Sequence, residues 1–143
     1  MWSDRVPLAV ELRHRSWHVG DVDAAMRIHD VAWVSNDLHD VPDLDRAAHD
    51  TSRTTAYLRL IGRHDGLSKD RIQRPQADGR AFWRDHIATL AERGVEKVFV
   101  VVNNHYEGHA PATLRTLADE LAAVPGLEVM ASPGWPNGQV TLF

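Results

Sequence analysis

The chain has 143 residues, 43% of them apolar, which suits one soluble globular domain. Its net charge of −4 gives no electrostatic case for a nucleic-acid or anionic-membrane surface, so we expect neither partner. The absence of cysteine excludes disulfides, thiolate metal sites and a cysteine nucleophile. With no signal-peptide core or membrane-length apolar run, the sequence predicts a cytoplasmic protein.

Four short apolar segments, each bounded by polar residues, predict the strands of an α/β protein. Helical spacing of apolar residues predicts three helices between and after these strands, the first capped by Asp21 or Asp23. A polar loop over residues 65–79 is long enough to be a lid or to lack order. The predicted strands are residues 8–12, 31–35, 56–61 and 98–102, with a short extra strand at 127–130, and the predicted helices are residues 21–29, 80–93 and 112–124.

The most informative segment is residues 98–111, where a β-branched apolar run predicts a strand buried on both faces. A cluster of amides, imidazoles and a carboxylate follows it at once, and Pro111 then opens a helix, where a missing N–H costs nothing. We interpret Glu107 in this cluster as a solvated loop carboxylate. This arrangement is typical of the sites that α/β folds present at their strand ends.

Each of the four predicted strands ends in polar or charged residues. Parallel strands with right-handed crossovers bring these ends to one edge of the sheet, so the four groups should be neighbours. The groups are Glu11 with Arg13, Asn36 with Asp37, Arg63 with His64, and Asn104 with His105.

Three segments resemble successive motifs of the YecE-like family, also called domain of unknown function 72. They are residues 9–17 (AVELRHRSW), 57–63 (YLRLIGR) and 102–111 (VNNHYEGHAP). The resemblance implies a TIM-type (β/α)8 barrel without an established activity. It also implies four further strands before these motifs, and tyrosines in the loop before the 80–93 helix, where residues 71–80 have none.

Because a TIM barrel takes about 250 residues, the resemblance implies that residues 1–131 are the C-terminal half of one. Residues 132–143, rich in proline, glycine and asparagine at their start, are expected to form a flexible tail. Three explanations stay open: a gene fragment, a wrongly assigned start, or a chain completed by association with a missing half or with itself.

Charged residues of the first and third strands are expected to meet at the barrel mouth. Glu11 and Arg13 lie on one strand face, and Arg59 points to the same side. A carboxylate held by two guanidiniums can bind or polarise an anionic or carbonyl group, but it can equally be a structural ion-pair network.

His105 and Glu11 are the acid–base candidates, because an imidazole at a strand end can act as a general base. Asn104, Asp37 and Arg63 are candidate substrate contacts, although the asparagine side chains can instead cap the next helix. We expect Trp17 to pack the loop after the first strand rather than to stack on a ligand.

Cofactors receive little support from the sequence. Glu11, Asp37, His64 and His105 could converge on a divalent cation, but no metal-binding spacing favours this, and we assign no metal ligands. The chain lacks phosphate-binding and nucleophile-elbow motifs, so no nucleotide or dinucleotide is expected.

The last residues, Gln139-Val-Thr-Leu-Phe143, resemble the peptides that bind the bacterial DNA sliding clamp, with Gln139, Leu142 and Phe143 as contacts. The alternative is a final strand packed on the domain. Two functions therefore stay open: a small-molecule or anion site of hydrolase or lyase type, and a non-catalytic module tethered to the clamp. A third hypothesis is that the chain is a truncated gene product without independent activity.

Overall fold

The computed structural model describes residues 7–37, 50–64 and 66–130 of the chain. The strands are β1 (Ala9–Val10), β2 (Ala32–Trp33), β3 (Ser35–Asn36), β4 (Thr55–Leu60) and β5 (Lys97–Val102). The helices are α1 (Gly20–Ile28), α2 (Ala77–Glu92), α3 (Asn104–Glu107) and α4 (Ala110–Ala122), and a 3-10 turn spans Arg15–Trp17. The expected α/β class is confirmed, and the 132–143 tail lies outside the described residues.

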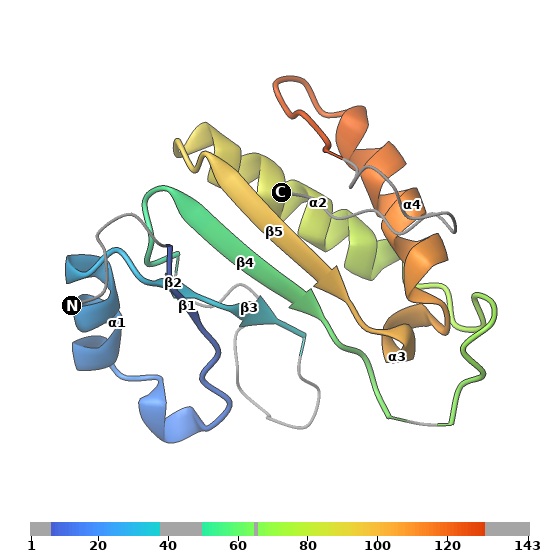
Figure 1. The fold of residues 1–143 in the computed structure, drawn as a ribbon, viewed down its shortest axis with the longest axis horizontal. Coiled ribbons are helices and arrows are strands. Elements are labelled where there is room, and N and C mark those ends of the chain that lie inside the picture. The colour runs from blue at the N-terminus through green and yellow to red at the C-terminus, as the bar shows by residue number, and fades with distance from the viewer. Residues whose placement is uncertain (1–6, 38–49, 65, 131–143) are drawn as a thin grey trace.

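The strands are parallel and lie in the order in which they occur along the chain (Figure 1). β1 pairs with β2, and β3 pairs with β4, which pairs with β5. Only Val34 separates β2 from β3, and its N–H donates to the carbonyl of Val10 at 2.9 Å. The predicted segment 31–35 therefore becomes two short strands with different partners, and the carboxyl ends of all strands point the same way.

One face of β4 and β5 carries the main core. Leu58 and Leu60 of β4 and Val100 of β5 are buried there against the indole of Trp83 in α2 and Leu117 in α4. Both helices lie on the same side of the two strands (Figure 1). Apolar residues three and four apart on α2 and α4 form this contact, as their spacing predicts.

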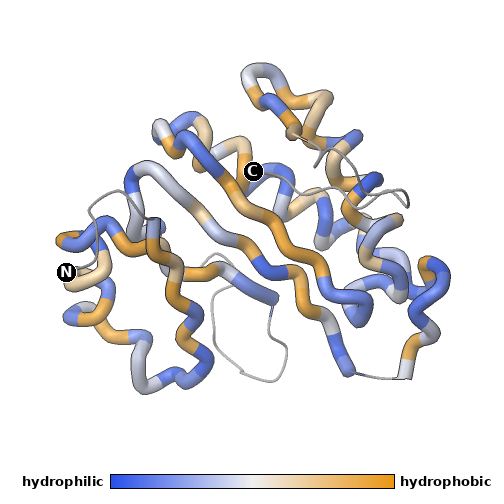
Figure 2. The backbone as a smooth tube through the Cα atoms, in the orientation of Figure 1, coloured by the Kyte–Doolittle hydropathy of each residue, from blue (hydrophilic) through white to orange (hydrophobic). Residues whose placement is uncertain are grey.

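The opposite face of these strands has no helix packed on it in the described part of the chain. Figure 2 shows β5 as a continuous hydrophobic run, yet Val101 is 41% exposed while Val100 and Val102 are buried. The prediction that this strand is buried on both faces is therefore wrong. Periodicity alone could not reveal which face lacks a covering layer.

The first helix packs on β1 and β2 through a smaller cluster centred on Met26 and Trp33. It begins at Gly20 and has Val19 as its N-cap without a side-chain hydrogen bond, so the predicted aspartate cap is wrong. The two aspartates lie in the first turn, where their charge suits the helix dipole. Trp17 is 54% exposed, which contradicts the expectation that it packs the loop.

One further prediction is wrong, and the expected lack of order in the 65–79 loop needs correction, whereas its role as a lid stays a prediction. Residues 127–130 do not form a strand. The polar loop before α2 is ordered over its described residues, because the N–H groups of Gln73 and Arg74 donate to the carbonyl of Glu107 at 2.8 and 3.1 Å. Since backbone hydrogen bonds tie the loop to α3, its length was no guide to its order.

Candidate functional site

The carboxyl ends of the strands bring the predicted polar residues to one edge of the structure. Glu11 follows β1, Asp37 follows β3, Gly62 lies just beyond β4, and the Asn103–His105 segment follows β5. In Figure 1 these ends lie on the same side as α3. The carboxyl ends of the strands therefore lie together at one edge, as expected.

Glu11 is the meeting point of two guanidiniums. The Arg13 Nε donates to Glu11 Oε1 at 3.0 Å, and the Arg59 Nη1 forms an ion pair with Glu11 Oε2. Val10 and Leu12 pack on the opposite side against the α1 cluster, so strand alternation fixes this orientation. One carboxylate with two guanidiniums leaves an excess positive charge, which favours an anion.

Asp37 is buried and binds backbone rather than another side chain. Its Oδ1 accepts a hydrogen bond from the Ile61 N–H at 2.5 Å, and the Gly62 N–H lies 3.3 Å from both carboxylate oxygens. These amides come directly after β4, where the ladder no longer supplies their acceptors. The contacts give Asp37 a positioning role for the segment that carries Arg63 and His64.

His105 lies in the short helix α3, in a segment that was predicted to be part of a loop. The Asn103 Oδ1 accepts from the His105 N–H at 3.1 Å and caps α3, while the Asn104 Oδ1 accepts from the Ala110 N–H at 2.8 Å at the start of α4. Both amides therefore have the structural roles that were left open for them. The His105 ring lies against His64, with ring centroids 4.0 Å apart.

Two hollows open among these residues. One, of about 250 Å³, is lined by Asp37, Gly62, Arg63, Arg74, Gln76 and Tyr106. The other, of about 410 Å³, has Arg59, Asn103 and Asn104 among its lining residues. Arg74 was not predicted to belong to the site, yet its Nη2 donates to the carbonyl of His105 at 2.8 Å. Its position after β4 in a long loop gave no signal of this contact.

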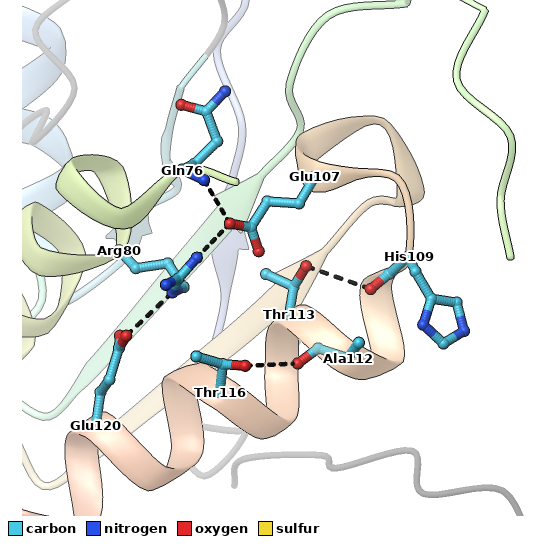
Figure 3. A network of polar contacts seen from close by, with 8 residues as sticks. All are labelled: Gln76, Arg80, Glu107, His109, Ala112, Thr113, Thr116 and Glu120. Carbon is cyan, nitrogen blue, oxygen red and sulfur yellow. Dashed lines mark hydrogen bonds and ion pairs between the residues drawn. The ribbon is translucent and has the colours of Figure 1, made fainter. Parts of the chain in front are cut away.

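Glu107 is the largest departure from the sequence-based interpretation, because its side chain is 1% exposed rather than solvated. It forms an ion pair with Arg80 of α2 and accepts a hydrogen bond from the Gln76 N–H at 2.5 Å. Arg80 also contacts Glu120 of α4 at 3.1 Å (Figure 3). The network joins α3 to both long helices, and no local pattern indicates partners 27 residues apart.

The hypothetical four-residue metal site is not assembled. His64 and His105 meet, but Glu11 is engaged by arginines and Asp37 by backbone amides. Within residues 7–37, 50–64 and 66–130, no group of three histidine, aspartate or glutamate side chains is arranged to hold a metal ion. None of the helices in the same ranges is long and apolar enough to cross a membrane.

Sequential parallel strands, helices on one side and charged side chains at the carboxyl edge define a βα-repeat protein with a polar rim. The chain belongs to the DUF72 family, described as protein of unknown function DUF72, whose profile matches residues 1–137. This confirms the family resemblance. No curated protein matches the chain.

Solved structures of the same family are similar to this one. A DUF72 family protein from Thermotoga maritima is 25% identical, with a TM-score of 0.66, and the match covers 82% of this chain and 47% of that one. A DUF72 family protein from Enterococcus faecalis is 18% identical, with a TM-score of 0.65 and coverage of 84% and 49%. The chain thus spans about half the length of the solved structures that it matches.

Proposed function

We propose that this DUF72 protein binds a small anion, carboxylate or phosphate, at the carboxyl ends of its strands. In this proposal the described sheet is half of a TIM-type (β/α)8 barrel, and the rim is half of its mouth. The sequential order of parallel strands supports the barrel, because doubly wound sheets reverse their strand order instead.

The ion pair between Arg59 and Glu11 carries the proposal. This ion pair joins two side chains that are 48 residues apart in the sequence and lie near the ends of different strands, as a shared rim requires. Arg13 adds a second positive charge to one carboxylate, and Arg63 and Arg74 line the neighbouring hollow. Guanidiniums bind carboxylate and phosphate through paired hydrogen bonds, and the excess of arginines favours such a ligand.

The proposal includes acid–base chemistry of hydrolase or lyase type, with His105 and Glu11 as its two acid–base candidates. His105 would exchange a proton with the bound ligand, and Glu11 would serve as the carboxylate partner across the rim. Asn104 would hold the loop between α3 and α4 through its contact with the Ala110 N–H. Aryl phosphates and aryl esters are the probes for hydrolysis, and His105→Ala should lower any turnover at least about tenfold.

Anion binding is tested by calorimetric titration with inorganic phosphate and, separately, with acetate. Arg59→Gln and Arg63→Gln should each weaken binding of the better anion at least about tenfold, since each removes a charge-assisted contact. Arg115→Gln is the matched control, because Arg115 is exposed on α4. Binding unchanged in both rim variants, or weakened equally in the control, contradicts the proposal, as does a wild-type protein that binds neither anion.

The C-terminal sequence supports an alternative of a different class. In it, Gln139, Leu142 and Phe143 anchor a non-catalytic module to the DNA sliding clamp, and the rim has no substrate. A pull-down with purified clamp compares the intact chain with one that lacks the last five residues. Loss of recovery in the shortened chain supports the tether, and equal recovery contradicts it.

A further inference from the structure

Trp17 presents an indole to solvent in the loop that follows β1. It is 54% exposed, and it ends the 3-10 turn Arg15–Trp17, beyond the carboxyl end of β1 (Figure 1). The other tryptophans of the described residues, Trp33 and Trp83, are 3% and 1% exposed. Because an indole offers a large aromatic surface for stacking, an exposed one near a polar site is a candidate ligand contact.

The turn that carries Trp17 is fixed by hydrogen bonds within it. The His14 Nδ1 accepts from the Ser16 N–H at 3.2 Å and lies 2.7 Å from the Ser16 hydroxyl oxygen. The Trp17 N–H donates to the His14 carbonyl at 3.0 Å. A turn held in this way loses little conformational freedom when a ligand binds to it, which favours affinity.

His18 ties the same turn to the candidate site. Its Nε2 lies 3.2 Å from the carbonyl oxygen of Leu12, and its ring packs against the buried indole of Trp33 in β2, with ring centroids 4.7 Å apart. Leu12 stands in the chain between Glu11 and Arg13, which form an ion pair. The turn is therefore anchored next to an arginine of the candidate anion site.

Positive charge accompanies the exposed indole. Arg13 and Arg15 are both exposed in the segment that leads into the turn. Glu11 pairs with Arg13 and with Arg59 of β4, so the guanidiniums at this position outnumber the carboxylate that they share. A guanidinium binds an anionic group and an indole stacks on a planar ring, so the combination suits a ligand that has both.

We propose that Trp17 is a binding residue that stacks on the aromatic ring of an anionic ligand, whose carboxylate or phosphoryl group the rim arginines hold. The ligand is then an aryl carboxylate or an aryl phosphate rather than an aliphatic acid or inorganic phosphate. This inference rests on the proposed anion site, and it names the class of molecule that the site takes.

Calorimetric titration of the full chain with two matched pairs of ligands tests the inference. The pairs are acetate with phenylacetate, and methylphosphonate with phenylphosphonate, in which no phosphate ester can be hydrolysed. The wild-type protein should bind the aryl member of at least one pair at least about fivefold more tightly than its parent, since stacking contributes on this scale. The pair that shows this preference distinguishes a carboxylate ligand from a phosphoryl ligand.

Replacing Trp17 with leucine keeps an apolar side chain but removes the planar ring. Trp17→Leu should reduce the preference for the aryl member to about twofold or less and leave the affinity for the parent anions unchanged. Trp17→Phe should retain part of the preference. Phe82→Leu is the matched control, because Phe82 is 38% exposed on α2 and packs against Trp83 there, so its preference should equal that of the wild type.

Tryptophan fluorescence gives a second readout on the same samples. Binding of the preferred aryl ligand should quench part of the wild-type emission, and this quenching should be absent in Trp17→Leu, which keeps the other tryptophans. Equal affinity of the wild type for parent and aryl anions, or a preference that Trp17→Leu retains, overturns the inference and leaves the proposed anion site standing. A wild-type protein that binds none of these ligands overturns both.

Discussion

Glu107 and Arg80 form an ion pair between α3 and α2 in which the two side chains are only 1% and 12% exposed. The same carboxylate accepts the Gln76 N–H at the start of α2, and the carbonyl of Glu107 accepts two N–H groups of the preceding loop. Glu107 therefore fixes the loop, the helix and the turn that carries His105 relative to one another.

Replacing Glu107 with alanine should destabilise the protein by about 3–5 kcal/mol, because Arg80 would keep its buried charge without this partner. Urea denaturation followed by circular dichroism measures the loss. Glu120→Ala is the matched control: Glu120 also contacts Arg80, but at a more exposed position, so about 1 kcal/mol or less is expected. Equal losses in the two variants would show that burial of Glu107 is unimportant.

Gly62 and Gly66 offer a comparison at one backbone conformation, since both have φ of +71°. A Cβ on Gly62 would overlap the backbone of His105 and Tyr106, whereas a Cβ on Gly66 would meet no atom within 4 Å. Gly66→Ala should cost about 1–2 kcal/mol from its left-handed backbone alone. Gly62→Ala should cost about 1–3 kcal/mol more through overpacking. Equal melting temperatures would contradict this close approach.

Asp37 supplies the hydrogen-bond acceptor for the amides of Ile61 and Gly62. Asp37→Ala should lower the free energy of unfolding by about 1–3 kcal/mol, because it leaves buried amides unsatisfied. Asp37→Asn retains an acceptor oxygen and should recover part of the loss. The Ile61 N–H should exchange with solvent faster in the alanine variant than in the asparagine variant. Equal exchange rates in the two variants would argue against this role.

Asp30 gives a pH-dependent contribution to stability. Its carboxylate accepts a hydrogen bond from the Arg53 N–H at 2.7 Å, and this hydrogen bond lowers the pKa of Asp30 below its ordinary value of 3.8. Because the folded-state pKa is the lower one, the stabilisation is present above pH 3.8 and is lost as pH falls through the folded value.

Asp30→Asn isolates this charge, since asparagine tolerates the positive φ of 52° at this position. The variant should be less stable than the wild type at pH 7, by less than about 1 kcal/mol. The difference should shrink as pH falls below 3.8. Thermal unfolding across pH 2–7 measures it, and a difference that does not change with pH would contradict the charge effect.

Much of the rim could be predicted because it depends on local rules. Strand alternation correctly assigned Glu11 and Arg13 to one side and Val10 to the other. Parallel connections correctly brought Arg59 to Glu11 from a separate strand. The helices around Trp83 and Leu117 followed from apolar spacing alone, which is why their existence was predicted better than their ends.

The sequence by itself determined helices α1, α2 and α4, the strand segments from β1 to β5, the direction in which their residues point and the family to which the chain belongs. Only the tertiary structure decided which face of β5 is covered, and that Glu107 is buried with Arg80 rather than solvated. The physical reason is the distance along the sequence over which each interaction acts. Periodicity and capping act over a few residues, whereas burial and ion pairing depend on groups that the fold brings together from distant parts of the chain.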